Sequence, residues 1–566
     1  MPDKLIMDRV KATPRCDWPV ADQELCGAGH YVGLYGGEHI AATEFVIGAT
    51  LVQYGCTATD ILIGLIIGNI LAVLSFTFLC AALAVDTRLT LYTYLSRILG
   101  GKMQKAYNAV LGIGLAALAA SGISISGTAI RRIFQVPIQT EWYPTNLRFV
   151  VIVLILGAVV TFIAANGFEA VSRFAATCVP WMISLFFVSL LITLPQLIQA
   201  VGSAGVHSPA DFLDLLNHYV WTGDNGAGGQ HLGIMHVIGF AWICNLAWHV
   251  GLNDMPMLRF AKTYKYGAIS AVGMFVGHFF AWIVAGIMGA TASIILSTPL
   301  AILDPGEVTF TLLGYTGLIA VIIAGWTTAN PTIYRITLAF NVIFHKIERK
   351  KLTYILGGII TIVACFPGCQ GAADILTYLG LAVEGIGAVC VTEHFLFPKI
   401  GLTRYWNLYR RKDMNLAATV SWVLSIVFDA VMIGSGVMHQ NLVFIPSFFV
   451  AAVSYVILAG LMGAKETYER EEKEEMEYEQ ALQEYVNSMR SEEQKPEKPV
   501  LARTLRGIGF VGLAVFVVCG ILCGMNVFPL ASYKILSLVL SLLYFICNGT
   551  AMVMIYRNQP LAEDAS

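Results

Sequence analysis

Residues 30–55 read HYVGLYGGEHIAATEFVIGATLVQYG, an apolar stretch with the polar run Gly36-Gly37-Glu38-His39 near its middle. Glycines at this depth loosen a helix and free its backbone carbonyls. A carboxylate inside a membrane costs about 2.5–3.5 kcal/mol on insertion scales, so Glu38 should face a cavity. The stretch therefore predicts a discontinuous membrane helix. Its break would hold either a site for ion coupling or cation recognition, or a structural acid paired with another buried side chain.

The composition of the whole chain is that of a membrane protein. Of its 566 residues, 57% are hydrophobic and 13% are charged, whereas soluble domains carry about 25% charged residues. The net charge of −2 gives no strong attraction to nucleic acid. We therefore expect a small-molecule solute and the lipid bilayer as partners, and no nucleic acid.

Motifs of catalysis are missing from the sequence. The twelve cysteines are scattered, mostly through apolar blocks, without metal-ligand spacing, which favours reduced and buried thiols. The sequence contains no HExxH, catalytic-triad or phosphate-loop motif. A membrane-embedded enzyme or a sensor is therefore the weaker alternative. We expect a protein that is not an enzyme and that uses no cofactor beyond a coupling ion.

Fourteen apolar stretches are candidates to cross a bilayer, which takes about 20 residues. They lie at 31–57, 59–86, 104–130, 147–166, 174–199, 232–254, 267–297, 310–334, 352–367, 372–397, 415–437, 442–463, 505–527 and 532–556. With the N-terminus inside, about 30 of the 35 Lys and Arg residues fall on the cytoplasmic side. This bias predicts a multi-pass protein of the cell membrane with both termini in the cytoplasm.

The chain divides into a transport core and added segments. Spans 1 and 6 are both interrupted, in corresponding places of two five-span halves, which predicts an all-α, five-plus-five inverted repeat. The expected parts are a cytoplasmic N-terminal segment (1–30), a ten-helix core (31–398), two peripheral helices (399–463), a charged cytoplasmic linker (464–503), an additional two-helix pair (504–558) and a tail (559–566).

The charged linker is either a solvated connection or, in part, an amphipathic helix that docks a protein partner. The second alternative depends on four residues that recur at helical spacing: Tyr478, Leu482, Tyr485 and Met489.

Span 6 and span 10 carry candidates for binding the solute. Residues 236–258 read HVIGFAWICNLAWHVGLNDMPML, where a half-helix end near Asn245 would present unpaired amides and carbonyls to a solute. Trp242 and Trp248 offer faces for stacking or cation–π contact, or else they are interfacial or core residues. Glu384 in span 10 is a second mid-membrane acid, which either binds the solute or is buried and hydrogen-bonded.

Span 8 carries the candidate cation site. It contains AGWTTANPTIYR (324–335), in which Ala324, Thr327 and Thr328 share one helix face through their i, i+3, i+4 spacing. Two hydroxyls and a carbonyl, opposite freed carbonyls of span 1, form an all-oxygen site that suits a hard cation. The alternative is that both threonines bond back to their own helix.

The block AGWTTANPTIYRITLAF (324–340) resembles the span-8 signature of the nucleobase–cation symporter family, of the purine–cytosine permease and hydantoin permease type. TEHFLFPK (392–399) and GLNDMPMLRFAK (251–262) are similar to further family motifs, and the resemblance covers residues 28–463. It implies a five-plus-five inverted repeat with two peripheral helices, working by alternating access. It also implies a sodium site, which maps onto the backbone of Glu38 and Ala41 and onto Ala324, Thr327 and Thr328.

The solute pocket departs from the family pattern. The matching part of span 3, LAALAASGISIS (115–126), has neither the Trp nor the Gln expected there. The candidate solute-binding residues are Gly37, Ser121, Trp242, Asn245, Trp248, Asn330 and Glu384. We expect a symporter that imports a small nitrogenous solute of the nucleobase, hydantoin or allantoin type with Na+ or H+. The alternative keeps the fold but transports an amine, a betaine or an amino acid.

Overall fold

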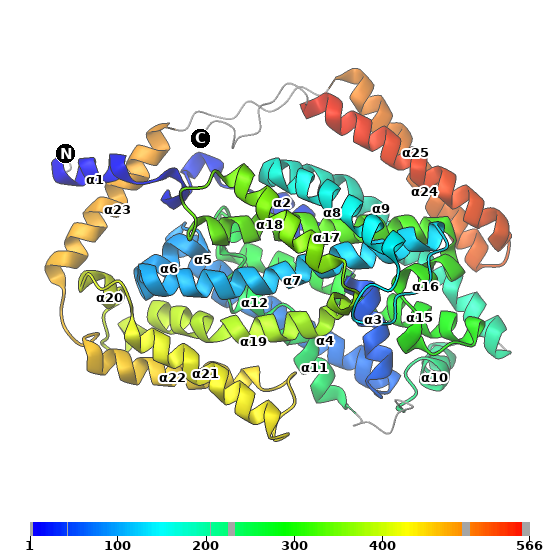
Figure 1. Cartoon of the computed structure of the whole chain (residues 1–566), viewed down its shortest axis with the longest axis horizontal. Coiled ribbons are helices and arrows are strands. Elements are labelled where there is room, and N and C mark those ends of the chain that lie inside the picture. The colour runs from blue at the N-terminus through cyan, green and yellow to red at the C-terminus, as the bar shows by residue number, and fades with distance from the viewer. Residues whose placement is uncertain (1–3, 42, 204, 225–231, 490–498, 557–566) are drawn as a thin grey trace.

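The computed structural model describes residues 4–556 except 42, 204, 225–231 and 490–498 (Figure 1). Within this range it describes no side chain for residues 16, 37, 38, 167–170, 172 and 556. The described chain forms helices joined by short connections, and its only β-type pairing is isolated bridges. The predicted all-α class is confirmed.

Eleven helices of the described chain are long and apolar enough to cross a membrane. They are Ala58–Thr87 (α4 to α5), Gly101–Ile133 (α7), Leu147–Ala165 (α8), Arg173–Val201 (in α9), Tyr264–Leu296 (ending in α15), Tyr315–Asn341 (α17), Ala372–Lys399 (beginning with α19), Leu416–Gly434 (α21), Phe444–Met462 (α22), Val500–Gly524 (α24) and Leu530–Ile555 (in α25). The chain is therefore a multi-pass membrane protein.

The three remaining predicted spans are the two interrupted ones and the short ninth one. Span 1 is α2 (Ala28–Glu38) followed by α3 (Thr43–Gln53). Span 6 is α11 (Ile234–Ile243) followed by α12 (Leu246–His249), and span 9 is the 16-residue α18 (Arg349–Ala364). The predicted discontinuity of spans 1 and 6 is confirmed.

Short helices connect or flank the spans. They are α1 (Lys4–Ala12), α6 (Leu91–Leu99), α10 (Pro209–Tyr219), α13 (Met255–Leu258), α16 (Pro305–Leu313), α20 (Trp406–Tyr409) and α23 (Glu469–Met489).

Two glycines let neighbouring helices approach the helix breaks. A Cβ on Gly277, in the seventh span, would lie 1.8 Å from the carbonyl oxygen of His39 in the break of span 1. A Cβ on Gly387, in α19, would lie 1.9 Å from the carbonyl oxygen of Val250, just after α12. Real Cβ atoms do not come this close to a backbone atom, so both contacts require glycine. The break of span 1 is thus held against span 7, and the end of α12, after the break of span 6, is held against span 10.

The core and the periphery differ in burial. More than two-thirds of the apolar window of α17 and of α19 is buried, against one-third in α21, α22, α24 and α25. The pair α21–α22 lies against α19, whereas α24–α25 lies against α9, on a different side of the bundle (Figure 1). Helices α17 and α19, which contact the interrupted spans, therefore lie inside the bundle, between two peripheral pairs.

The charged linker contains the helix α23, which packs against α1 (Figure 1). Tyr478 and Leu482 are buried in a small apolar cluster with Val10 of α1. Arg9 forms an ion pair with Glu475, with 2.7 Å between its Nη2 and the carboxylate Oε2. The amphipathic helix proposed for the linker is present, and its apolar face contacts the N-terminal segment of the same chain.

Candidate functional site

The two helix breaks meet at one small cavity. Its volume of about 50 Å³ is well below the ~300–1,000 Å³ of typical ligand pockets, so the site is contracted in this structure. Spans 1, 3, 6, 7, 8 and 10 all contribute to its wall: His39, Ala41, Thr43, Glu44, Leu118, Asn245, Trp248, His278, Thr327, Thr328, Pro331, Thr332, Arg335 and Leu376.

Three oxygens of span 8 gather on one side of this cavity. The hydroxyls of Thr327 and Thr328 both donate to the carbonyl oxygen of Ala324, at 3.0 and 2.9 Å. These are the helix-internal bonds that threonines form in membrane helices. They leave the lone pairs of both hydroxyl oxygens available, however, and they hold three oxygens within one turn. Ala41, just after the break in span 1, lines the same cavity.

A polar wall stands between spans 1, 6 and 7. The amide nitrogen of Asn245 lies 3.0 Å from Nδ1 of His278, whose ring stacks on Trp282 at a centroid distance of 4.4 Å. The indole N–H of Trp282 in turn donates to the carboxylate of Glu44. Glu44 also accepts a hydrogen bond from Thr43 at 3.3 Å. The four side chains of this polar wall contact one another in the order amide, imidazole, indole and carboxylate. Three of the four line the cavity.

A buried ion pair lies at another part of the cavity wall. Arg335 of α17 donates to Asp254, with 3.2 Å between Nη2 and Oδ1, and both side chains are at least 95% buried. Asp254 precedes α13, which immediately follows the broken sixth span. The pair therefore ties span 8 to the end of span 6.

Five of the sequence-predicted residues line the cavity: Ala41, Asn245, Trp248, Thr327 and Thr328. Ala324 joins them through its carbonyl oxygen. The predictions for Gly37 and for the side chain of Glu38 fall on residues whose side chains the structure does not describe. Ser121 and Asn330 are fully buried, their side chains have no hydrogen-bond partner among the described residues, and neither lines the cavity.

The structure places Trp242 and Glu384 away from the cavity. Trp242 contacts Phe444 of α22 edge to face at 5.1 Å, and its indole N–H donates to Ser75 at 3.0 Å. Glu384 lies deep in α19, where it interacts electrostatically with Asp429 of α21. Both residues thus face the packing between core and peripheral helices.

Sequence reasoning missed Glu44, His278 and Arg335 as site residues. Glu44 lies in the same stretch as Glu38, and a second acid in an apolar span is the signal that could have found it. His278 stands alone in span 7, where a single histidine is more often a packing residue. Its role depends on a contact with Asn245 that lies 33 residues away in the sequence.

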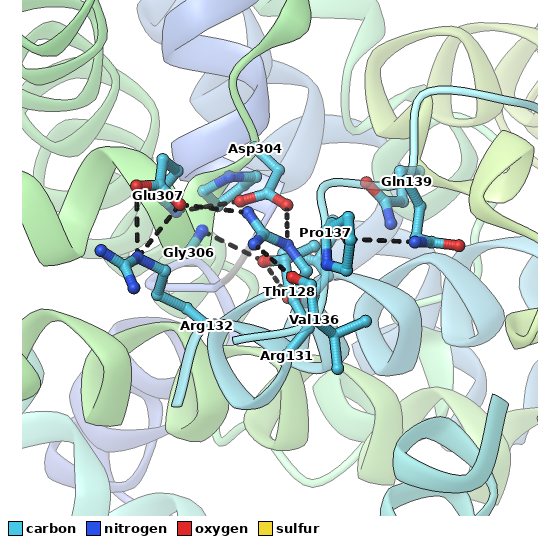
Figure 2. Close-up of polar contacts among 12 residues, drawn as sticks. Thr128, Arg131, Arg132, Val136, Pro137, Gln139, Asp304, Gly306 and Glu307 are labelled. Atoms are coloured by element: carbon cyan, nitrogen blue, oxygen red, sulfur yellow. Dashed lines mark hydrogen bonds and ion pairs between the residues drawn. The ribbon is translucent and has the colours of Figure 1, made fainter. Parts of the chain in front are cut away.

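A second polar cluster joins the end of α7 to the start of α16 (Figure 2). Nε of Arg131 donates to Oδ2 of Asp304 at 2.6 Å, and its Nη2 reaches Glu307 at 3.4 Å. Arg132 contacts the same Glu307 at 3.1 Å. Burial raises the pKa of Asp304, although the guanidinium of Arg131 favours its ionised form. Asp304 also lines a larger cavity of about 440 Å³ beside α3.

Fold and site together define a class: all-α, multi-pass membrane proteins in which two broken helices meet at a central cavity. Among solved structures, the chain is similar to Mhp1, a nucleobase-cation-symport-1 family transporter, in a closed conformation with bromovinylhydantoin bound. The TM-score is 0.59 at 13% identity, over 82% of this chain and 99% of that chain. The inward-facing conformation of Mhp1 gives 0.58 at 13% identity, over 82% and 97%.

A Na+-coupled sialic acid symporter, in a substrate-bound outward-open state, matches with a TM-score of 0.55 at 14% identity, over 81% of this chain and 95% of that chain. No protein-family model and no curated protein matches the sequence. The resemblance predicted from span 8 is thus confirmed at the level of the fold. The part of the chain that these structures leave uncovered is about as long as the segment 464–566.

Proposed function

We propose that this chain is a cation-coupled secondary transporter that binds a small solute in the central cavity. One observation carries the proposal. Residues at both helix breaks line the same cavity, and Thr327 and Thr328 of span 8 line it as well. Broken helices at the midplane present free amides and carbonyls to solutes and ions, and alternating access moves the repeats around such a site. The likeness in fold to two kinds of symporter supports it.

Sodium is the proposed coupling ion. It would bind the backbone oxygens of Glu38 and Ala41 and the three oxygens of Ala324, Thr327 and Thr328. A hard cation prefers such an all-oxygen set. An ion shared by spans 1 and 8 would favour the arrangement in which these spans are close, and the same arrangement would favour solute binding. Proton coupling is the alternative for the same cavity, because Glu44 lines it.

The proposed solute is a small nitrogenous compound of the nucleobase, hydantoin or allantoin type. The amide of Asn245 can donate and accept, and the indole N–H of Trp248 has no hydrogen-bond partner among the described residues. A flat heterocycle with ring N–H and C=O groups fits these donors and acceptors. The contracted cavity implies that the solute binds a more open state.

An amine, betaine or amino acid is the second candidate, and one observation favours it. Glu44 is buried and lines the cavity, although it lies beside the indole of Trp282. A buried carboxylate next to a solute cavity suits a cationic group, and the ring of Trp248 offers a face for cation–π contact. The proposed direction is import across the cell membrane, with both termini in the cytoplasm.

A thermal-shift screen of the purified protein tests these proposals. Nucleobases, hydantoins, amines and amino acids are added one at a time, with sodium or with the same concentration of potassium. A ligand raises the unfolding temperature according to its affinity, and sodium enlarges that rise only if the two sites are coupled. Uptake of the best ligand into proteoliposomes follows. If neither a sodium gradient nor a pH gradient drives this uptake, the coupled mechanism is wrong.

A further inference from the structure

Two acidic side chains interact outside the central cavity, where α19 meets the peripheral helices. Glu384 of α19 is fully buried and Asp429 of α21 is 5% exposed. They interact with each other electrostatically. The hydroxyl of Ser447, on α22, lies beside both carboxyl groups. Three helices thus bring two carboxyl groups and one hydroxyl to a single buried point.

This pair has no cationic partner in the described chain. Apart from the hydroxyl of Ser447, no donor of the described chain reaches the carboxyl oxygens of Glu384 and Asp429. No cationic side chain is among the electrostatic partners of either acid. Two ionised carboxylates this close in an apolar interior would repel each other, and neither would be compensated. At least one member of such a pair is therefore neutralised, by a proton or by a bound cation.

Four other titratable groups on the helices around α19 have partners of their own. They are Tyr107 of α7, which donates to the carbonyl of Gly251; His249 of α12, whose ring contacts the carbonyl of Trp242; Glu44 of α3, which accepts from Trp282; and Glu393, which accepts from Tyr455 of α22. Neither Glu384 nor Asp429 has a cationic side chain among its electrostatic partners, so the neutralising proton or ion comes from outside the protein.

The packing favours a proton over a metal ion. A Cβ on Gly385, next to Glu384, would lie 2.2 Å from the hydroxyl oxygen of Ser425 on α21, so α19 and α21 are in close contact there. Neither acid lines the two cavities described above. A hard metal cation takes about six oxygen ligands, whereas this point offers two carboxyl groups and one hydroxyl. A proton needs only two oxygens.

We propose that Glu384 and Asp429 together hold one proton, with the carboxylic acid of one donating to the carboxylate of the other. The O–H bond forms on one carboxyl oxygen, and the remaining negative charge lies on the second group, beside the Ser447 hydroxyl. This is a proton-binding site separate from the proposed sodium and solute sites. It lies between the transport core and the α21–α22 pair.

Infrared spectroscopy of the purified full-length protein tests the proposal directly. The C=O band of a protonated carboxyl is separate from carboxylate bands and shifts in heavy water. We expect the wild type to show this band, and the double variant Glu384→Gln/Asp429→Asn to lose intensity that corresponds to one protonated carboxyl. The control Asp374→Asn removes a more exposed acid of α19, hydrogen-bonded to Gln440, and should lose none.

Unchanged intensity in a folded double variant would overturn the proposal. So would a wild-type band that disappears when potassium is replaced by sodium, because the pair would then hold the metal ion. If the double variant does not fold, Ser447→Ala keeps both acids. It should shift the frequency of the band, while Ser454→Ala on the same helix, whose hydroxyl bonds to Val450, should not. If the carboxyl C=O band has the same frequency in Ser447→Ala and Ser454→Ala, the proposed proton-sharing pair is also contradicted.

Discussion

At the scale of single residues, some side chains of the cavity wall form hydrogen bonds within their own helix and can still accept a hydrogen bond or coordinate a cation. Thr327 and Thr328 each use their hydroxyl hydrogen on Ala324 and keep their oxygen lone pairs. This is why the sequence left two alternatives open for them, an ion site or back-bonding. The two alternatives do not exclude each other, because a hydroxyl can donate to a carbonyl and still coordinate a cation.

Thr328→Ala should weaken sodium binding while leaving the fold intact. The change removes one proposed ligand oxygen, and we expect the sodium concentration for half-maximal stabilisation by solute to rise at least about tenfold, or ~1.4 kcal/mol. The matched control is Thr337→Ala on the same helix, whose hydroxyl bonds to Ile333 and contacts Thr353 of α18. Equal sodium dependence in both variants would remove Thr328 from the site.

Trp282→Phe should destabilise the protein through Glu44. The variant keeps the ring that stacks on His278 but removes the indole donor to a buried carboxylate. Loss of a hydrogen bond to a buried group costs about 1–3 kcal/mol. The control is Trp326→Phe, since the indole N–H of Trp326 has no partner among the described residues. The unfolding temperatures of both variants are compared, and a smaller drop for Trp282→Phe would contradict the role of this contact.

At the scale of elements, the helix breaks depend on neighbours that approach them closely. Gly277→Ala should therefore cost more than an ordinary Gly-to-Ala change. Its Cβ would collide with the carbonyl oxygen of His39, a backbone atom that cannot rotate away, and overpacking of this kind costs about 1–3 kcal/mol. Gly358→Ala in α18, where a Cβ meets nothing within 4 Å, should be neutral or stabilising. Unfolding temperatures with and without solute measure both effects.

The contact between α1 and α23 is the second element-scale feature with a clear test. Leu482→Ala removes a side chain that is buried against the N-terminal segment. The cluster is small, so we expect α23 to detach and limited proteolysis within 464–498 to become at least several-fold faster. Met489→Ala, at a side chain that is 53% exposed on the same helix, serves as control. Cleavage at equal rates in both variants would show that the contact does not hold α23.

At the scale of the whole molecule, the central site and the terminal pair are separate. No residue of α24 or α25 lines the central cavity, and the pair is held against α9 by contacts such as Trp181 with Ser541 at 3.0 Å. Deletion of residues 500–566 should therefore lower the unfolding temperature but leave the sodium-dependent shift by solute in place. A folded, monodisperse truncation without that shift would show that the pair takes part in binding.

Much of this architecture could be predicted from the sequence, because it follows from local patterns. Long apolar runs, the glycines of span 1 and the threonine face of span 8 each leave a signal within about 20 residues. The contacts within the polar wall left none, since Asn245, His278 and Glu44 meet only after three separate spans are packed together. Trp242 and Glu384 show the opposite error: the sequence predicted that they bind the solute, but they contact other helices away from the cavity. A polar or aromatic residue at membrane depth predicts a polar contact, but not which helix provides it.

The contact between α1 and α23 also constrains how the protein is made. α1 precedes the membrane spans in the chain, and the residues it packs against lie more than 460 positions further along, as the bonds from Arg9 and Thr13 show. Until residue 482 has left the ribosome, Val10 has no apolar partner on α23 to cover it. The apolar side of α1 therefore stays uncovered by α23 while the twelve predicted spans between them are synthesised and inserted into the membrane. Only afterwards can α23 pack against α1.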